Sequence, residues 1–458
     1  MIHSDTIAAV STGMTSAGIS MIRISGEQAF VIADQIFRGP GKAVAEMPSH
    51  TIHYGFIYDG DRMVDEVLLS VMRAPATYTR EDIVEINCHG GIAVTKEVLR
   101  VVLERGARLA EPGEFTKRAF LNGRIDLSQA EAVMDLIQSG SRAAMDASLR
   151  QLRGSLKERI LTDKDAILQT IAMIEAALDD PEHYDTGMEF RGEIQNSVSA
   201  VYTDLKKLAD TFENGRVIRE GIRAVIVGKP NAGKSSIMNV LLGENRAIVT
   251  DIAGTTRDTL EESLKMDGLM LNIIDTAGIR ETEDAIEQIG MERALSAVEE
   301  ADLVIYVIDG SVPLDQNDHV IMDRIRGKKT ICLINKADLP AAVDEDNIHH
   351  LLSSPVLRVS AKEHQGMEAF SEEVKKMFEA GKLQAGEETF LTNLRHYEEI
   401  CSAVSSLTLA MDSMKKGMPE DFISIDLTDA YHALANVVGE DVGDDLIDRI
   451  FSTFCVGK

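Results

Sequence analysis

The segment at residues 228–235, GKPNAGKS, constrains the fold of this chain more than any other. A β-branched run at 224–227 precedes it, and a run with the composition of a helix follows at 236–242. Glycines let backbone N–H groups and a helix N-terminus face an anionic phosphate. The order strand, glycine-rich loop and helix therefore predicts a phosphate-binding loop. In such a loop Lys234 reaches the phosphate oxygens and the Ser235 hydroxyl binds Mg²⁺.

Four further motifs follow in the order that a guanine-nucleotide switch requires. They are DIAGTTRD at 251–258, DTAG at 275–278, NKAD at 335–338 and SAK at 360–362. Any one of these short motifs is weak by itself, because a tetrapeptide of this kind is usually a solvated surface turn. Five motifs in this order, each at the end of a predicted strand, predict that the chain binds GTP.

Each motif supplies a different part of the nucleotide site. A hydroxyl of 251–258 can complete the Mg²⁺ shell, Asp275 can hold the ion through water, and the Gly278 N–H can contact the γ-phosphate. The Asp338 carboxylate matches the N1–H and 2-amino donors of guanine, which adenine cannot offer as a pair. The motif at 360–362 is expected to support the guanine O6.

The residues expected to hydrolyse GTP depart from those of the small signalling GTPases. Those proteins carry a water-orienting glutamine at the position of Ile279, and an aliphatic side chain cannot replace it. Asn231 and backbone carbonyls near Thr250 and Ile252 can instead hold a monovalent cation that neutralises charge at the phosphates. The alternative is that Asn231 only stabilises the turn of the loop. The charged segment 280–287 holds several acids, and their spacing does not choose among them.

Length, charge and cysteine usage limit the number of domains, the kind of partner and the cellular compartment. The 458 residues suffice for about three domains. A net charge of −28 argues against a broad nucleic-acid-binding surface but leaves room for a local basic patch. Four cysteines without a CxxC pair suggest neither a zinc site nor a disulfide framework, so we expect a cytoplasmic protein. No signal-like segment or apolar run of about 18 residues occurs, so no membrane association is expected.

The pattern of apolar residues changes along the chain. Strand-like and helix-like runs alternate up to about residue 118, which predicts an α+β domain. Apolar residues then recur at steps of three and four, both before the phosphate-loop region and after it. Amphipathic helices on both sides must bury their apolar faces, so we expect an α/β Ras-like G domain inserted into one mostly α-helical domain. The expected domains are residues 1–118, 119–215, 216–384 and 385–458, of which the second and fourth form the helical domain.

The end of the chain, Ser452-Thr453-Phe454-Cys455-Val456-Gly457-Lys458, has an unusual composition. A free thiol this close to a terminus normally belongs to an ordinary frayed tail. The other interpretation is a reactive thiolate at Cys455, which the nearby Lys458 would favour. Physical reasoning from the residues leaves both open.

Several segments together resemble one known family. They are Asp5-Thr6-Ile7, Arg23-Ile24-Ser25-Gly26, Pro112-Gly113-Glu114-Phe115-Thr116, Asp126-Leu127-Ser128-Gln129-Ala130-Glu131-Ala132 and Phe454-Cys455-Val456-Gly457-Lys458. With the G-domain motifs, they resemble the MnmE (TrmE) family of tRNA-modification GTPases. The resemblance covers essentially the whole chain, and its terminal signature is far more specific than a phosphate loop.

The resemblance implies a function for each domain. Members bind 5-formyl- or 5,10-methylene-tetrahydrofolate in an aminomethyltransferase-like N-terminal domain, which also forms a homodimer. With a FAD-dependent partner of the MnmG type, in a heterotetramer or larger complex, they act on certain tRNAs. They convert C5 of the wobble uridine, U34, to a carboxymethylaminomethyl or aminomethyl form, with folate as the one-carbon source. GTP hydrolysis in the family is stimulated by K⁺.

The resemblance also assigns site residues. Folate contacts fall on Arg23, Glu85, Arg124 and Lys458. Arg124 departs from the lysine common in the family and keeps the charge but not its geometry. Mg²⁺ falls on Ser235 and Thr256, and K⁺ on Asn231, Thr250, Ile252 and Thr255. The catalytic glutamate of hydrolysis falls on Glu287, and we expect Cys455 to act in the uridine modification. Val456 stands where isoleucine is common.

Motifs and resemblance together give the expected nucleotide and ion site. Its residues are Asn231, Ala232, Gly233, Lys234, Ser235, Ser236, Thr250, Asp251, Ile252, Ala253, Gly254, Thr255, Thr256, Asp275, Thr276, Ala277, Gly278, Asn335, Lys336, Asp338, Ser360, Ala361 and Lys362.

Two other functions compete with this interpretation. A ribosome-assembly GTPase could act as a pure switch, but such proteins usually carry an RNA-binding module with a basic face, and this chain is acidic. A stand-alone folate-dependent transferase would explain the N-terminal domain but leave the G domain without a role.

Overall fold

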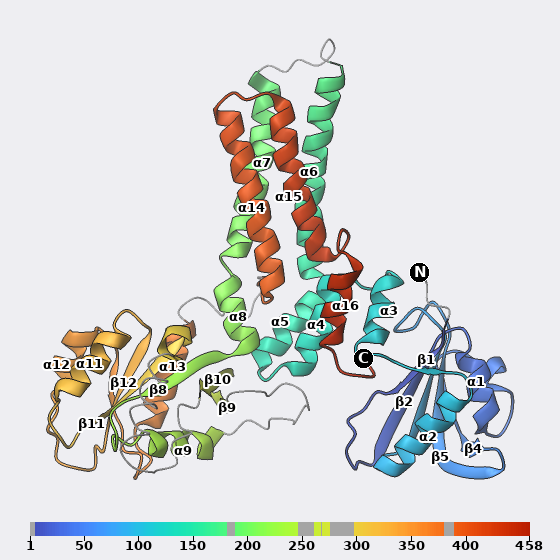
Figure 1. Cartoon of the computed structure of the whole chain (residues 1–458), viewed down its shortest axis with the longest axis horizontal. Helices are drawn as coiled ribbons and strands as arrows, with labels where there is room; N and C mark the ends of the chain where they lie inside the picture. Colours follow the sequence, from blue (N-terminus) through green and yellow to red (C-terminus); the bar gives the residue numbers. More distant parts are fainter. Residues whose placement is uncertain (1–4, 181–187, 246–260, 267, 275–296, 380–388) are drawn as a thin grey trace. The chain divides into compact units, whose positions relative to one another are not determined.

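The computed structural model describes residues 5–180, 188–245, 261–266, 268–274, 297–379 and 389–458 (Figure 1). The chain forms two compact units. One comprises Met1–Met134, Gln151–Val201 and Ser405–Lys458, and the other comprises Asp135–Arg150 and Tyr202–Val404. Among the described residues, no helix combines the length and the apolar character that a membrane span needs.

The N-terminal part of the first unit is an α+β domain, as the alternating pattern predicts. Its described residues form a seven-stranded sheet in the order β3-β4-β5-β6-β2-β1-β7. The pairing is antiparallel except between β1 and β7. The strands are β1 (Ile7–Val10), β2 (Ile19–Ser25), β3 (Phe37–Arg38), β4 (Thr51–Asp59), β5 (Arg62–Met72), β6 (Ile83–His89) and β7 (Arg108–Leu109). The helical segments are α1 (Ala29–Ile36), η1 (Val44–Glu46), α2 (Ile92–Glu104) and α3 (Glu114–Leu121).

The alternation of side chains along the central strands decides which face of this sheet is buried. Ile22 and Ile24 of β2 and Ile86 of β6 point toward α1 and α2 and are fully buried with them. Arg23 and Glu85 lie between these positions and therefore face the other side of the sheet. This second face is the one that carries polar side chains for a site.

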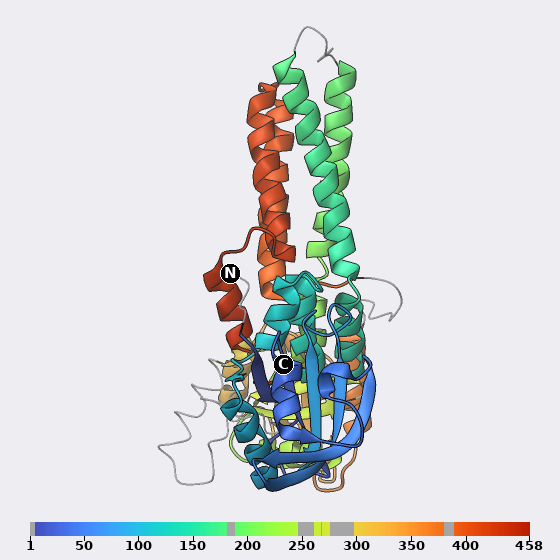
Figure 2. The same cartoon turned by 90° about the vertical axis from the view of Figure 1, so that its right-hand side faces the viewer.

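Helices that precede and follow the G domain in sequence pack together in the first unit (Figure 2). Helix α6 (Ser155–Asp179) contacts α15 (Glu420–Val438), which confirms that the G domain interrupts one helical domain. Hydroxyl groups of Thr170 and Ser197 lie 2.9 Å apart between α6 and α7. Further described helices between the N-terminal domain and the G domain, or after the G domain, are α4 (Leu127–Gln138), α5 (Arg142–Leu152), α7 (Met188–Ala209), α8 (Phe212–Glu220), α14 (Leu394–Lys415) and α16 (Asp444–Ser452).

The G domain lies in the second unit and is a doubly wound α/β sheet. Its described residues form six strands in the order β13-β12-β11-β8-β10-β9, and only the β9–β10 pair is antiparallel. The strands are β8 (Ile222–Val227), β9 (Glu261–Met266), β10 (Leu269–Ile274), β11 (Leu303–Asp309), β12 (Thr330–Asn335) and β13 (Val356–Arg358). The helices are α9 (Lys234–Asn245), α11 (Gln316–Ile325), α12 (Glu345–Leu352) and α13 (Met367–Glu379).

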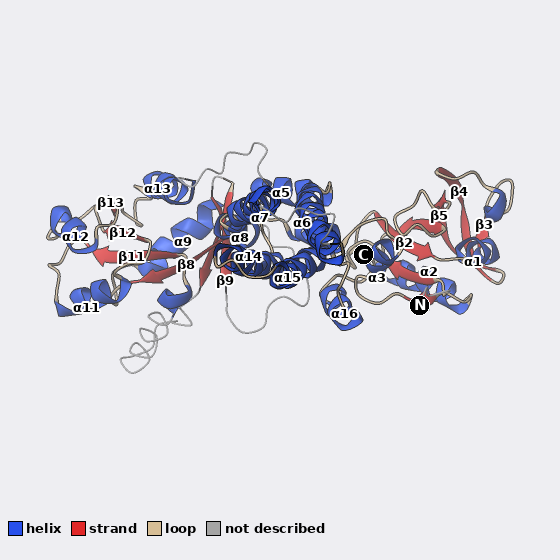
Figure 3. Ribbon diagram, turned by 90° about the horizontal axis from the view of Figure 1, so that it is seen from above, coloured by secondary structure: helices blue, strands red, loops and turns tan. Residues whose placement is uncertain are grey.

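Both faces of this sheet are covered. Ile226 and Ile305 pack in a cluster with α9 and α13, whereas Val225 and Val304 pack in another with α11 and α12. Figure 3 shows α13 and α11 on opposite sides of the strands. Strands buried on both faces read as continuous apolar runs, which is how they appear in the sequence. The domain boundaries at 118, 215 and 384 stay predictions.

Candidate nucleotide site and N-terminal pocket

The predicted phosphate loop joins β8 to α9 as the sequence pattern indicates. Its backbone is left-handed at Asn231, with φ of 59°, and at Gly233, with φ of 97°. A Cβ atom on Gly233 would lie 2.0 Å from Nδ2 of Asn335, so only glycine fits there. Ser235 and Ser236 are exposed in the first turn of α9. This loop and the start of the helix therefore have the exposed backbone geometry that can bind an anion.

The Lys234 side chain folds back over the loop. Its amine donates hydrogen bonds to the carbonyls of Gly228 at 2.9 Å and Lys229 at 2.8 Å. These contacts hold the ammonium group beside the concave face of the loop, where phosphate oxygens can exchange with the carbonyls as partners.

One buried side chain connects the phosphate loop to both base-recognition motifs. The Nδ2 group of Asn335 donates to the Ala232 carbonyl at 2.9 Å, and its Oδ1 accepts from the Ala361 N–H at 3.1 Å. The Ala337 N–H also donates to the Val359 carbonyl at 3.0 Å. The structure therefore brings together three segments that sequence reasoning could only place in order.

The Asp338 carboxylate is exposed and held in the ionised form. The Ser360 hydroxyl donates to Asp338 Oδ1 at 2.8 Å, and this hydrogen bond lowers the pKa of Asp338 below its usual value. Lys336 adopts a left-handed backbone and pairs with Asp309 at 2.6 Å between Nζ and Oδ2. An ionised acceptor is what recognition of the two N–H donors of guanine requires.

A second contact of the phosphate loop was missed by sequence reasoning. Lys229 forms ion pairs with Asp315, at 2.8 Å, and with the buried Asp318, at 2.6 Å. Burial alone would lower the pKa of Lys229, but the hydrogen bonds with these two carboxylates outweigh it and raise the pKa. Asp315 also caps α11, so the loop is fixed to the start of that helix. No sequence signal connects positions 229 and 318.

Several predicted residues lie outside the part of the chain that the structure describes. They are Thr250, Asp251, Ile252, Ala253, Gly254, Thr255, Thr256, Asp275, Thr276, Ala277, Gly278 and Glu287.

The first unit contains the residues assigned to folate by resemblance. Arg23 and Glu85 are direct neighbours on β2 and β6, and Arg23 Nη2 lies 2.8 Å from Glu85 Oε1. The Arg23 guanidinium carbon lies 5.5 Å from the ring centroids of both Tyr78 and Phe115. These distances allow cation–π attraction, which fixes the side chain against the two rings.

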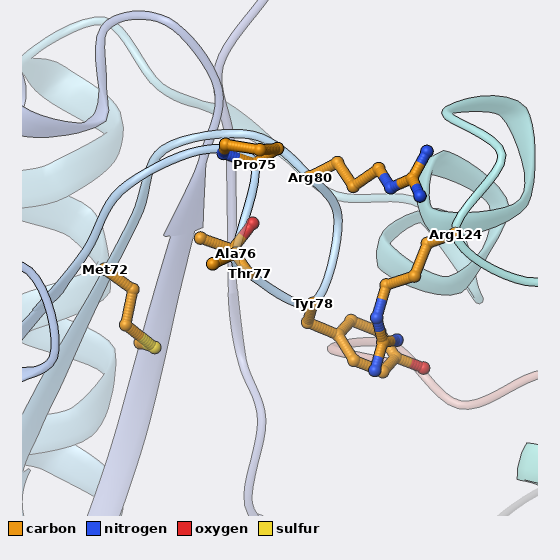
Figure 4. Close-up of a pocket in the computed structure, with 7 residues that line it drawn as sticks. All are labelled: Met72, Pro75, Ala76, Thr77, Tyr78, Arg80 and Arg124. Atoms are coloured by element: carbon orange, nitrogen blue, oxygen red, sulfur yellow. The ribbon is translucent and has the colours of Figure 1, made fainter.

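Arg124 lies beside the same tyrosine. Its guanidinium carbon is 4.8 Å from the Tyr78 ring centroid, and the Tyr78 hydroxyl is hydrogen-bonded to the Thr116 hydroxyl at 2.9 Å. A cavity of about 490 Å³ opens here (Figure 4). It is lined by Met72, Pro75, Ala76, Thr77, Tyr78, Arg80 and Arg124.

The C-terminal segment docks on the N-terminal domain and is not a frayed tail. Pro112 pairs with Val456 in an antiparallel bridge, and the carbonyl of Lys458 accepts from the Phe115 N–H at 3.2 Å. A Cβ atom on Gly457 would lie 2.1 Å from the Val10 carbonyl oxygen, so this close approach requires glycine.

The docking brings the end of the chain beside two aromatic rings, which also contact Arg23 and Arg124. Cys455 and Tyr78 pack against one apolar cluster, which includes Phe451 and Phe454. Arg23 and Arg124 contact Tyr78, while Phe115 contacts Arg23 and holds the terminal carbonyl. Sequence reasoning missed both rings, although Phe115 lies within one of the quoted segments.

The fold and this site define the class of the protein. A phosphate loop connected through a buried asparagine to the exposed carboxylate of the NKAD motif, on a doubly wound sheet, is a P-loop GTP-binding domain. Here that domain is inserted into a helical domain preceded by an α+β domain.

Comparisons with known proteins identify the family. Residues 127–455 match the family model described as MnmE helical domain, and residues 6–124 match GTP-binding protein TrmE N-terminus. The chain is 50% identical to the tRNA modification GTPase MnmE of Lachnoclostridium phytofermentans, over 99% of this chain and 100% of that protein. It is 46% identical to the protein of the same name from Geobacillus kaustophilus, over the whole of both chains. With the Acetivibrio thermocellus protein the identity is 48%, again over the whole of both chains. The chain belongs to the MnmE family of tRNA modification GTPases.

Proposed function

We propose that this chain is a GTPase that acts in the modification of the wobble uridine of certain tRNAs. The observation that carries the proposal is the Asn335 side chain, which joins the phosphate loop to the guanine-recognition motifs. Relatives along the whole chain that are named tRNA modification GTPases supply the reaction.

The residues of the G domain fit GTP with a bound Mg²⁺. The exposed Ser235 hydroxyl stands at the start of α9, next to the loop that receives the phosphates. Ser235 and Thr256 would hold the ion, which neutralises phosphate charge. Asn231, Thr250, Ile252 and Thr255 would hold K⁺. The left-handed Asn231 backbone also stabilises the loop, so a structural role and an ion-binding role are compatible.

Glu287 is our candidate for orienting the attacking water. The reason is that Ile279 occupies the position of the water-orienting glutamine, and its side chain cannot accept or donate a hydrogen bond. A carboxylate can accept the proton of a water, directly or through a second water, while K⁺ offsets developing negative charge.

The N-terminal pocket supports a tetrahydrofolate ligand. Tyr78 offers a flat apolar surface, Arg23 and Arg124 offer cations, and Glu85 offers a carboxylate for pterin N–H donors. Lys458, whose carbonyl is held by Phe115, would complete the site. When bound, the folate supplies a one-carbon unit for C5 of the uridine.

The remaining parts of the proposal follow from the family. The chain would form a homodimer through its N-terminal domain and work in the cytoplasm with a FAD-dependent partner of the MnmG type. Cys455, held by the docked tail beside the cluster that contacts Tyr78, would act in the uridine chemistry.

Steady-state GTP hydrolysis by the purified chain, in KCl and in NaCl at matched ionic strength, tests the hydrolytic part. We expect a large rate increase specific to K⁺, lost in Glu287→Ala and retained in the control Glu281→Ala from the same segment. Equal slow rates in both salts would remove the K⁺ mechanism, and a wild-type rate in Glu287→Ala would remove that residue from it.

A further inference from the structure

The cavity beside Tyr78 has two chemically different ends. Met72 stands at one end of the cavity and the side chains of Arg80 and Arg124 stand at the other (Figure 4). Pro75 and Ala76 add apolar surface to the wall of the cavity. Such a cavity fits a ligand with an apolar body and an anionic end.

The Arg80 side chain is fixed at the rim of this cavity. Its Nη1 donates to the Asn122 carbonyl at 2.9 Å, while Asn122 Nδ2 donates to the Thr79 carbonyl at 2.7 Å. The Arg80 backbone is left-handed, with φ of 60°, which a non-glycine residue adopts only where its surroundings hold it. One hydrogen bond leaves most of the five guanidinium donors for a ligand.

Within the described part of the chain, Arg80 and Arg124 lack the carboxylate partners that some other arginines of this domain have. Arg23 pairs with Glu85, and Arg118 pairs with Glu114. Of the carboxylates that the structure describes, none forms an ion pair with Arg80 or Arg124. In a chain of net charge −28, two such cations that line one cavity offer a place for an external anion.

The Arg80 guanidinium lies close to the backbone that leads into Arg124. A Cβ atom on Gly123, the residue before Arg124, would lie 3.6 Å from Arg80 Nη1. Arg124 is also oriented by the Tyr78 ring. Planar guanidinium groups bind carboxylates in pairs of parallel hydrogen bonds, so two neighbouring arginines suit a ligand with more than one carboxylate.

We propose that Arg80 is a specificity-determining residue that, with Arg124, binds the carboxylates of the glutamyl tail of a reduced folate. The inference rests on the proposed function, in which a tetrahydrofolate occupies this domain. Each glutamate added to the tail adds one carboxylate, so the pocket should prefer folates with several glutamates. A tRNA phosphate is the competing anion, but a cavity with apolar wall residues such as Met72 and Pro75 favours a ligand with an apolar body over a nucleic-acid backbone.

Calorimetric titration of the full-length chain with 5-formyl-tetrahydrofolate, as monoglutamate and as triglutamate, tests this. We expect the triglutamate to bind the wild type roughly tenfold more tightly, because one charge-assisted hydrogen-bonded pair is worth about that factor. In Arg80→Gln the preference should fall to within about twofold while monoglutamate binding persists. Arg62→Gln is the matched control, since Arg62 is exposed in the same domain, pairs with Glu97 and does not line the cavity.

The outcomes separate this inference from the proposed function. Suppose that the monoglutamate binds, but Arg80→Gln keeps the wild-type preference for the triglutamate or the wild type shows no preference. Arg80 then does not bind the glutamyl tail, while the proposed folate binding stands. If neither folate binds the wild type, the folate assignment fails and this inference fails with it. Weaker tRNA binding by Arg80→Gln, with an unchanged folate preference, would assign the arginine pair to nucleic acid and overturn the inference.

Discussion

Asn335 and Ala232 lie 103 residues apart in sequence and are joined by a hydrogen bond of 2.9 Å from the Asn335 side chain to the Ala232 carbonyl. The same amide accepts the Ala361 N–H, so the two halves of the nucleotide site are connected through a side chain that is only 2% exposed. We therefore expect both phosphate binding and base recognition to depend on this one buried group.

Removing that group should weaken nucleotide binding, because it breaks the connection between the two halves of the site. Asn335→Ala leaves the Ala232 carbonyl and the Ala361 N–H without their buried partner, at a cost of about 1–3 kcal/mol each. We expect GDP and GTP affinities to fall by roughly tenfold to a hundredfold in equilibrium titrations. Asn317→Ala, an exposed asparagine of the same domain, is the control. An unchanged affinity in Asn335→Ala would show that the connection has no energetic importance.

Asp338 should determine which base is accepted. Xanthine carries a carbonyl where guanine carries its 2-amino group, so an asparagine amide at this position matches xanthine better than a carboxylate does. Asp338→Asn should therefore lose most GTP hydrolysis and gain hydrolysis of xanthosine triphosphate. Competition titrations with both nucleotides check this. Retention of full GTP preference in the variant would place guanine recognition elsewhere.

The pH dependence of the free energy of unfolding should show how much the Glu114 carboxylate contributes to stability. Burial alone would raise its pKa, but hydrogen bonds from Arg108, the Glu111 N–H and Arg118 outweigh it and lower the pKa. A lowered pKa means that the stabilisation is present above the ordinary value, near 4.5, and is lost as pH falls through the lowered one. Glu114→Gln should cost about 1.5–3 kcal/mol at neutral pH, because it removes a charged hydrogen-bond partner of the buried Arg118, which keeps Asp5 and Glu81.

Denaturant unfolding from pH 7 to pH 3 measures this difference. The gap between wild type and Glu114→Gln should shrink below about pH 4.5. Glu27→Gln, an exposed carboxylate of the same domain, should show little change at any pH. A gap that stays constant with pH would mean that Glu114 acts through packing and not through its charge.

The Tyr78 ring should contribute more to folate binding than its hydroxyl does. The ring contacts the guanidinium groups of Arg23 and Arg124, whereas the hydroxyl only meets Thr116. Tyr78→Leu should weaken binding of 5-formyl-tetrahydrofolate by about threefold to thirtyfold, as expected for losing cation–π contacts and a stacking surface. Tyr78→Phe should bind nearly as the wild type does. Equal losses in both variants would favour the hydroxyl as the important group.

Local motifs made much of this protein predictable. A strand, a glycine-rich loop and a helix are encoded in about twenty consecutive residues, and the NKAD and SAK motifs likewise follow their own strands. The helical repeats on both sides of the G domain correctly predicted its insertion, because an amphipathic face must be covered. In each case the residues that specify the element lie close together in sequence.

Contacts between distant residues were not predictable in the same way. The pairing of Lys229 with Asp318 depends on the order of strands in the sheet, which no local pattern specifies. Tyr78 lies in a short turn-rich segment between β5 and β6, and its role appears only when β2, α3 and the C-terminal tail meet around it. The docked position of Cys455 likewise depends on Gly457 fitting against Val10.

Mass spectrometry of tRNA nucleosides tests the central claim most directly. The chain would be produced in a bacterial strain that lacks its own relative of this protein but keeps the flavin-dependent partner. The account predicts that the wild type and the control Cys401→Ser restore C5-modified wobble uridine, whereas Lys234→Ala, which removes the ammonium group from the phosphate loop, does not. Unmodified tRNA with the wild-type chain, or full modification with Lys234→Ala, would contradict the claim that this is a GTPase whose nucleotide site serves tRNA modification.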